Sequence, residues 1–181
     1  ILEVLSNIET NVNVIYVVDD ACPQNTGDLV TQQVSASRVR VIKHKKNLGV
    51  GGATLTGYRQ AVSDGHEILV KIDGDGQMNP SLIPKIIAPI LDGKADYTKG
   101  NRFHSDGEIS PMPMARVIGN ICLSLLSKIS TGYWDIFDPT NGFTAIHSNV
   151  FQRLKTIKIS NGYFFESDVL FQLAIIRAVV K

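Results

Sequence analysis

Short apolar runs alternate along this chain with longer segments in which apolar residues recur every three or four positions. The first pattern predicts strands buried on both faces, and the second predicts amphipathic helices. The predicted strands cover residues 14–18, 39–42, 68–72, 95–99 and 143–146. The predicted helices cover residues 28–34, 51–63, 80–91 and 167–180. Strands that alternate with helices predict one α/β domain over residues 1–181, with a mostly parallel sheet flanked by helices.

Capping residues mark several of the predicted helix ends. Thr26 is the expected N-cap of the first helix, because its hydroxyl can accept a hydrogen bond from a free backbone N–H. Asn79, which is followed by proline, marks the start of the third helix, and Gly65 and Gly93 follow helix ends. One more apolar stripe at helical spacing is interpreted as core-facing, and it consists of Met114, Val117, Ile118, Ile121, Leu125 and Ile129.

The composition is that of an ordinary globular domain. The 181 residues are 44% hydrophobic and 19% charged, and 18 Lys and Arg nearly balance 17 Asp and Glu. This balance gives no global positive field, so we expect no nucleic-acid partner. In the one basic cluster, Arg38 and Arg40 alternate with valines, as on the exposed face of a strand. Lys45 lies beyond the end of that strand, where it can meet phosphate.

Cysteine use and hydropathy suggest a reducing, cytoplasmic setting. The two cysteines and the four histidines form no metal-ligand spacing, and two cysteines make no disulfide framework. No run of about 18 apolar residues occurs, so no membrane-spanning segment is predicted. The chain begins at Ile1 rather than Met and ends inside an apolar predicted helix. We therefore expect a piece of a longer polypeptide, with membrane association through segments outside this chain.

The most informative segment is Lys71-Ile72-Asp73-Gly74-Asp75-Gly76-Gln77, directly after the third predicted strand. Two carboxylates separated by one small residue can hold a divalent cation and leave room for phosphate oxygens, as Mg²⁺ prefers. We therefore predict a metal–diphosphate site at Asp73 and Asp75. A glycine-rich turn and the paired aspartates of aspartate-nucleophile phosphotransferases remain alternatives. An EF-hand loop is excluded, because Met78 and Pro84 stand where that loop needs glycine and glutamate.

Four polar segments each follow a predicted strand: Asp19-Asp20, residues 45–52, residues 73–75 and residues 100–102. Ligands of open α/β sheets bind outside the carboxyl ends of the strands. All four segments are therefore expected at one rim of the sheet, where together they offer carboxylates, glycines and basic side chains. We interpret this rim as a ligand site.

The glycine-rich segment 47–52 follows a strand and opens a helix, as the phosphate loop of a dinucleotide-binding domain does. Thr54 occupies the third glycine position, however, and Asp73, which would be the ribose-binding acid, already belongs to the paired carboxylates. No Gly-Lys-Ser/Thr sequence of a Walker loop occurs. A dehydrogenase is therefore a poor match, and close packing of this helix on the sheet also explains the glycines.

Six motifs follow one another along nearly the whole chain. They are Val17-Val18-Asp19-Asp20, Asn47-Leu48-Gly49, Asp73-Gly74-Asp75-Gly76-Gln77, Gly100-Asn101-Arg102, Asp138-Pro139-Thr140-Asn141-Gly142-Phe143 and Gly162-Tyr163-Phe164-Phe165-Glu166-Ser167-Asp168. This ordered set resembles the family-2 glycosyltransferases of GT-A fold, and most of all the branch that transfers sugars to polyprenyl phosphates such as dolichyl or undecaprenyl phosphate. The resemblance implies a Rossmann-like GT-A sheet whose first strand is missing from this chain.

The resemblance also implies an inverting transfer from a nucleotide-diphosphate sugar to a lipid-phosphate or glycan acceptor, at the cytoplasmic face of a membrane in cell-envelope glycan synthesis. Mg²⁺ or Mn²⁺ would be held by Asp73 and Asp75. The residues expected to bind the nucleotide sugar are Asp19, Asp20, Lys45, Asn47, Gly49 and Asp73. The residues expected at the reaction centre are Arg102 and Asp138, together with Glu166 and Asp168 as candidate bases.

One departure from the family pattern concerns base recognition. Residues 21–25 read Ala-Cys-Pro-Gln-Asn, where the family usually has a Gly-Ser-Thr-Asp turn. The donor nucleotide is therefore left open. A sugar-phosphate nucleotidyltransferase and a non-catalytic nucleotide-binding fragment remain as alternative functions.

Overall fold

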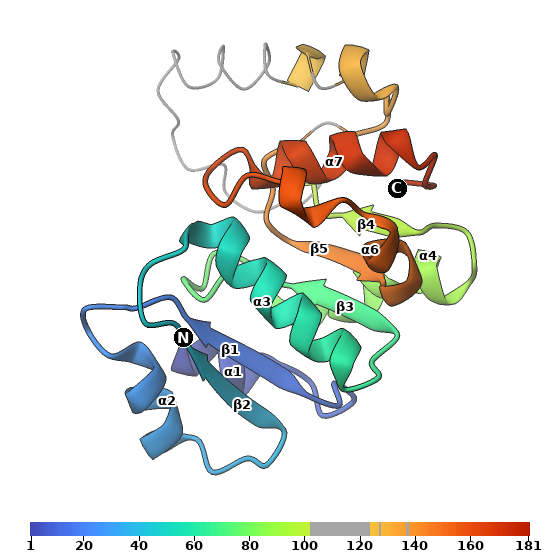
Figure 1. Ribbon diagram of the computed structural model, residues 1–181. Coiled ribbons are helices and arrows are strands. Elements are labelled where there is room, and N and C mark those ends of the chain that lie inside the picture. The colour runs from blue at the N-terminus through green and yellow to red at the C-terminus, as the bar shows by residue number, and fades with distance from the viewer. Residues whose placement is uncertain (102–123, 127, 137) are drawn as a thin grey trace.

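The computed structural model describes residues 1–101, 124–126, 128–136 and 138–181 (Figure 1). The helices are α1 (Leu2–Asn7), α2 (Thr26–Gln33), α3 (Gly49–Ser63), α4 (Ile83–Leu91), α6 (Ser148–Arg153) and α7 (Phe165–Ile175), with short 3₁₀ turns at Pro80–Leu82 and Thr156–Lys158. The strands are β1 (Ile15–Asp19), β2 (Val39–Lys43), β3 (Ile68–Lys71), β4 (Tyr97–Lys99) and β5 (Thr144–His147). No helix among the described residues is long and apolar enough to cross a membrane.

The described strands form two groups. β1 and β2 are parallel, with Ile15 opposite Val39 and Asp19 opposite Lys43. β5 lies between β3 and β4 and runs antiparallel to both. The predicted α/β class is therefore confirmed, but β5 makes the sheet mixed. A local sequence pattern reports that a strand is buried and does not report its direction.

Helices cover both faces of the strands (Figure 1). One core joins α3, α6 and α7 and contains the fully buried Ile146, Leu170 and Leu173. The other joins α1 and α4 to the opposite face and includes Val30 of α2. The continuous apolar runs that predicted buried strands are thus explained by a layer of helices on each side.

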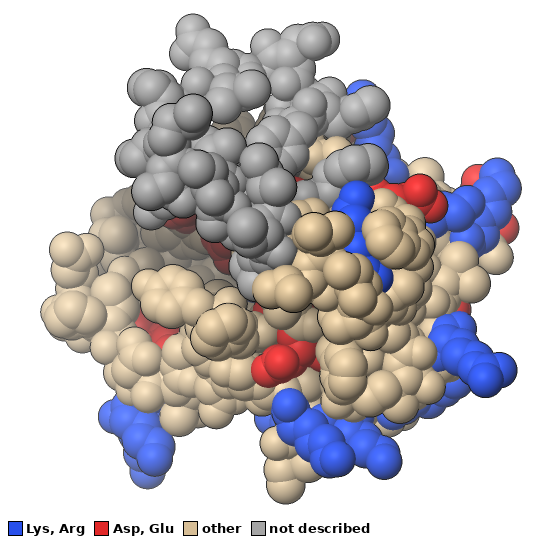
Figure 2. All heavy atoms as spheres, turned by 90° about the horizontal axis from the view of Figure 1, so that it is seen from above, with Lys and Arg blue, Asp and Glu red and all other residues tan. Residues whose placement is uncertain are grey.

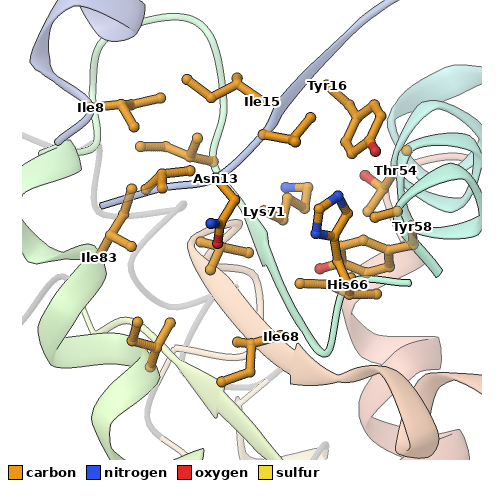
Figure 3. A pocket seen from close by; sticks show the side chains of 18 of the residues that line it. Ile8, Asn13, Ile15, Tyr16, Thr54, Tyr58, His66, Ile68, Lys71 and Ile83 are labelled. Atoms are coloured by element: carbon orange, nitrogen blue, oxygen red, sulfur yellow. The ribbon is translucent and has the colours of Figure 1, made fainter. Parts of the chain in front are cut away.

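A cavity of about 890 Å³ lies between β1 and β3 (Figure 3). Tyr58 of α3 lines one side of it, and Ile83 of α4 and Ile8, next to α1, line the other. We call this cavity the slot. An open slot between two strands is consistent with the expectation that one strand of the sheet is missing from the chain.

Backbone groups of β1 point into the slot. The N–H of Ile15 bonds to Arg38 and the carbonyl of Asp19 accepts from His44, so these residues face β2. Because the backbone N–H and C=O groups of successive residues point to opposite edges of a strand, those of Tyr16 and Val18 point into the slot. On β3, the carbonyl of Glu67 accepts from Ser148 beside β5, so Ile68 and Val70 face the slot in the same way.

Most predicted helix ends agree with the structure, but one N-cap was wrong. Gly65 and Gly93 follow α3 and α4 with φ of +84° and +67°, a left-handed conformation that glycine adopts without strain. Asn79 accepts a hydrogen bond from the N–H of Ser81, as predicted. The N-cap of α2 is Asn25 rather than Thr26, and its side chain makes no capping bond.

Two predicted helices differ from the structure. α7 ends at Ile175 rather than at residue 180, because Arg177 turns to a φ of +54° and Val180 pairs with Tyr97 beside β4. In the stripe predicted as core-facing, Leu125 and Ile129 lie in helical segments but are 51% and 64% exposed. The rest of that stripe lies outside the described residues. Helices α1 and α6 were not predicted.

The glycines at the start of α3 pack closely, but their partner is not the sheet. Gly49 has a φ of +82°, and a Cβ on it would lie 2.4 Å from the carbonyl oxygen of Asn161. A Cβ on Gly51 would lie 2.5 Å from the carbonyl oxygen of Ser160. The N–H of Gly51 donates to the carbonyl of Asn161. Glycine is therefore required here because α3 touches the backbone of residues 160–162, just before α7.

This contact predicts that Gly51→Ala destabilises the protein although alanine is the better helix former. We expect a net loss of about 1 kcal/mol or more, because a backbone carbonyl cannot rotate away from the added methyl group. Gly162→Ala is the matched control, since its Cβ would meet only the Ser160 hydroxyl at 3.9 Å. Chemical denaturation of both variants measures the difference in the free energy of unfolding. Equal stability of the two variants would show that the backbone of residues 160–162 shifts to make room for the methyl group.

The slot predicts an alternating pattern of amide hydrogen exchange in the 181-residue chain. We expect Tyr16 and Val18 to exchange about 10-fold or more faster than Val17, because only Val17 donates its N–H to a neighbouring strand. The same contrast is expected between Val70 and Leu69 on β3. NMR-detected exchange measures each amide. Uniform protection along both strands would mean that the slot edges are paired in solution.

Candidate active site

The paired aspartates lie directly after β3, as predicted. Asp73 is 38% exposed, and its Oδ1 accepts a hydrogen bond from Lys71 Nζ at 2.9 Å. Asp75 is exposed, and its Oδ1 accepts from the N–H of Gln77 at 3.0 Å. Gly76, which follows Asp75 in the turn, has a φ of +84°. Two carboxylates in an exposed turn fit a divalent ion, whose hard oxygen ligands they would supply in part.

Among the described residues, no group of three or more His, Cys, Asp or Glu could hold a metal ion. Water and a bound diphosphate can supply further ligands to a cation at Asp73 and Asp75. Mg²⁺ and its substitutes are commonly held in this way, by one or two carboxylates and substrate phosphates.

Gly142, in the turn before β5, lies against Asp73. A Cβ on Gly142 would lie 2.6 Å from Asp73 Oδ2 and 2.5 Å from Lys71 Nζ. The absence of a side chain at this position therefore lets the turn approach the paired aspartates. This links the Asp-Pro-Thr-Asn-Gly motif to the aspartate motif, although about 65 residues separate them in the sequence.

Behind Asp73, two buried lysines share one buried glutamate. Lys71 Nζ lies 3.1 Å from Glu166 Oε1, and Lys99 Nζ lies 3.3 Å from Glu166 Oε2. The side chains of Lys71, Lys99 and Glu166 are 8%, 1% and 10% exposed. Lys71 also donates to the carbonyl of Gly142, and Lys99 donates to the carbonyl of Asn141. We call Lys71, Glu166 and Lys99 the lysine bridge.

The two lysines respond differently to their burial. Burial lowers the pKa of Lys71, but the Glu166 and Asp73 carboxylates more than offset it, so the pKa of Lys71 is raised. For Lys99 burial dominates, and its pKa lies below the ordinary value in spite of Glu166. Glu166, predicted as a candidate base, thus lies between two ammonium groups and forms an ion pair with each of them.

Asp19 is committed to local structure. It is 8% exposed, and its carboxylate accepts hydrogen bonds from the N–H groups of Cys22 at 2.8 Å and Gly27 at 2.7 Å. These bonds hold the turn after β1 and the first residues of α2. Asp19 therefore acts as a turn and helix-end residue, and its carboxylate faces backbone rather than the open rim.

Asp20 organises the loop that opens α3. Its carboxylate accepts from the N–H groups of Leu48 and Gly49, both at 2.8 Å, and lies 2.6 Å from His44 Nδ1. Burial alone would raise the pKa of Asp20. Hydrogen bonds with His44, Leu48 and Gly49 lower it by more, so the pKa of Asp20 lies below its usual value. Asn47 Oδ1 also accepts from the N–H of Gly49. Asp20, Asn47 and Gly49 thus form one hydrogen-bonded loop.

The remaining predicted residues are distributed around this rim. Lys45 is exposed beyond β2. Asp138 is buried, at 6% exposure, and begins a turn in which Thr140 Oγ1 donates to its Oδ1 at 3.1 Å. Asp168, in the first turn of α7, accepts from the N–H of Ser160 at 2.8 Å and so ties the preceding loop to the helix. Arg102 lies outside the described residues.

Sequence reasoning missed the two lysines and His44. Lys71 stands between Val70 and Ile72 in a predicted strand, which is a signal for a buried charge with a partner, whereas Lys99, between Thr98 and Gly100, has no such signal. His44 bridges Asp20 and Thr56, with Nδ1 2.6 Å from Asp20 Oδ1 and Nε2 3.0 Å from the Thr56 hydroxyl. No local spacing predicts that contact.

Basic and acidic side chains occupy different parts of one face of the molecule (Figure 2). Figure 2 shows Lys and Arg side chains mainly along the edge of this face and several Asp and Glu side chains in hollows nearer its middle. The described part of the face has no continuous basic surface of the kind that binds nucleic acid.

Solved structures with the same architecture are GT-A glycosyltransferases. Glucosyl-3-phosphoglycerate synthase from Mycobacterium tuberculosis, solved with Mn²⁺, UDP-glucose and phosphoglyceric acid, has a TM-score of 0.59 and 20% identity, over 88% of this chain and 55% of that one. At this identity the similarity establishes the fold. Structures of this fold thus include examples with a bound divalent metal.

Some sequence relatives have names that describe sugar transfer to a polyprenyl phosphate. The chain is 32% identical to a UDP-N-acetylglucosamine–dolichyl-phosphate N-acetylglucosaminyltransferase of Methanococcus voltae, over 85% of this chain and 66% of the relative. It is 30% identical to an undecaprenyl-phosphate mannosyltransferase of Micrococcus luteus, over 88% of this chain and 65% of the relative. The chain thus spans just under two thirds of the length of these relatives.

The family model described as "Glycosyl transferase family 2" matches residues 1–155. This match includes β1 to β5, the paired aspartates and the loop held by Asp20. The resemblance inferred from the six motifs is thereby confirmed, and the chain belongs to glycosyl transferase family 2.

Proposed function

We propose that this chain forms the catalytic site of an inverting glycosyltransferase that moves a sugar from a nucleotide-diphosphate donor to a polyprenyl phosphate. The observation that carries the proposal is the pair Asp73 and Asp75, in a turn directly after a buried strand, with one glycine between them and another after Asp75. Such a turn suits a metal-bound diphosphate. Family membership supplies the reaction type.

On the donor side, Asp73 and Asp75 would hold Mg²⁺ or Mn²⁺. When bound there, such an ion would supply Lewis-acid stabilisation of the leaving nucleoside diphosphate, an effect worth several kcal/mol in metalloenzymes. The loop of Asp20, Asn47 and Gly49 borders the nucleotide. Its hydrogen bonds fix its shape before the ligand arrives, which lowers the ordering cost of binding. Lys45, at the same rim, contacts phosphate.

On the acceptor side, the choice of a lipid phosphate follows from the names of the relatives. A phosphate is already anionic near neutral pH, so it needs cationic positioning more than a base that removes a proton. Arg102 is proposed for this role, because a guanidinium can bind phosphate with two parallel hydrogen bonds. Asp138 and Asp168 shape the acceptor side through the turn and the loop that they hold.

The alternatives are disfavoured on different grounds. The relatives transfer sugars by name, which argues against a nucleotidyltransferase. A non-catalytic nucleotide-binding fragment would still bind nucleotide but would not turn over. We propose that the reaction takes place at the cytoplasmic face of a membrane, because the proposed acceptor is a lipid phosphate.

The first prediction tests the metal site. UDP or GDP should bind on the order of 10-fold more tightly with Mn²⁺ than with EDTA, because the ion bridges the carboxylates and the diphosphate. Asp75→Asn should abolish that difference and leave the melting temperature nearly unchanged, since Asp75 is exposed. Calorimetric titration measures both affinities. The control is Asp92→Asn, which breaks only the exposed ion pair with Lys94. Metal-independent binding in the wild type would contradict the site.

The second prediction distinguishes a phosphate acceptor from a hydroxyl acceptor. With a polyprenyl-phosphate acceptor we expect Arg102→Ala to lower kcat/KM severely, by about 10²-fold or more, and Asp168→Asn to lower it by less than about 10-fold. Arg40→Ala is the control, because Arg40 pairs with Asp64 and lies over the Tyr16 ring, and neither residue belongs to the predicted site. A loss of about 10³-fold in Asp168→Asn, with nearly normal Arg102→Ala, would instead mean a hydroxyl acceptor activated by a base.

A further inference from the structure

Lys71 contacts three oxygen atoms that belong to three different parts of the fold. Its Nζ donates hydrogen bonds to Asp73 Oδ1 at 2.9 Å and to the carbonyl oxygen of Gly142 at 3.2 Å. It also forms an ion pair with Glu166 Oε1 at 3.1 Å, an oxygen that accepts no hydrogen bond within the described part of the chain. The position of Lys71 therefore depends on the balance between the two carboxylates.

That balance bears on the candidate metal site. Lys71 and a divalent cation are both positive, and both are attracted to the Asp73 carboxylate. Lys71 is buried, so water screens this competition poorly. A second carboxylate that forms an ion pair with Lys71 would weaken the ion pair between Lys71 and Asp73.

We propose that Glu166 is a positioning residue for the candidate metal site: by sharing Lys71 it limits the ion pair between Lys71 and Asp73 and leaves Asp73 available to a divalent cation. This inference rests on the proposed function, in which Asp73 and Asp75 hold the ion. It gives Glu166 a role through Lys71 rather than as a base.

Lys99 adjusts the same balance from the other side. Its Nζ lies 3.3 Å from Glu166 Oε2, so Lys99 draws on the charge that Glu166 offers to Lys71. Loss of Lys99 should therefore strengthen the attraction between Glu166 and Lys71. It also removes one positive charge from the neighbourhood of Asp73. Both effects favour binding of a cation.

The test measures the affinity of Mn²⁺ with UDP or GDP by calorimetry, together with nucleotide affinity in EDTA. Glu166→Gln keeps the size of the side chain and removes its charge, and we expect it to weaken the Mn²⁺-dependent binding about 10-fold. Lys99→Met, similar in length, should tighten it. Nucleotide affinity in EDTA should not change in either variant. A purely structural role would shift both variants in the same direction, or would change binding in EDTA as well.

A double variant gives the sharpest result. Lys71→Met removes the competitor of the cation, so it should restore Mn²⁺ affinity in the Glu166→Gln background. Asp92→Asn, at the exposed ion pair with Lys94, is the control for loss of a carboxylate elsewhere. Circular dichroism and thermal melting confirm that each variant is folded. If Glu166→Gln does not fold, the inference is decided by Lys99→Met alone: tighter Mn²⁺-dependent nucleotide binding supports it, and unchanged or weaker binding overturns it.

The outcomes separate this inference from the proposed function. Metal-dependent binding in the wild type, with no loss in Glu166→Gln or no gain in Lys99→Met, would overturn the role of Glu166 and leave the metal site standing. No metal dependence in the wild type would overturn both. Failure of Lys71→Met to restore binding would show that Glu166 does not act through Lys71.

Discussion

The lysine bridge is the interaction on which the candidate site depends. Two buried ammonium groups meet one buried carboxylate where β3, β4 and α7 come together, and each ammonium also holds a backbone carbonyl of the Asn141-Gly142 turn. Removing one partner of such a cluster leaves a buried charge uncompensated, which is far more costly than losing a surface ion pair. The bridge therefore fixes three motifs relative to one another, and the paired aspartates take their position from it.

The nucleotide side of the rim is organised by a different kind of contact. Asp20 collects two backbone N–H groups and His44, and Gly49 and Gly51 let α3 touch the backbone of residues 160–162. α3 packs on both β1 and β3. Since the slot separates those two strands, this helix is a main connection between the half of the rim that carries Asp20 and the half that carries Asp73.

The parts of this arrangement that sequence could predict are those with a local cause. Buried strands have continuous apolar runs, and the Asp73-Gly74-Asp75 turn follows one directly, so both were predicted. Lys71 and Lys99 were missed as site residues because their environment comes from residues 141, 142 and 166, far away along the chain. The direction of β5 and the exposure of Leu125 and Ile129 are likewise set by packing, which periodicity does not report.

The charges at the rim explain why a cation is expected at this position. Asp73, Glu166 and Asp138 supply three carboxylates to the neighbourhood of two ammonium groups, Lys71 and Lys99, and Asp138 raises the pKa of Lys99 through its charge. The most exposed of the three carboxylates is Asp73. A divalent cation can reach an exposed carboxylate without losing all of its water ligands, which Mg²⁺ gives up reluctantly. The lysine bridge therefore holds Asp73 at the open side of a cluster of charges, where Asp75 can share an ion with it.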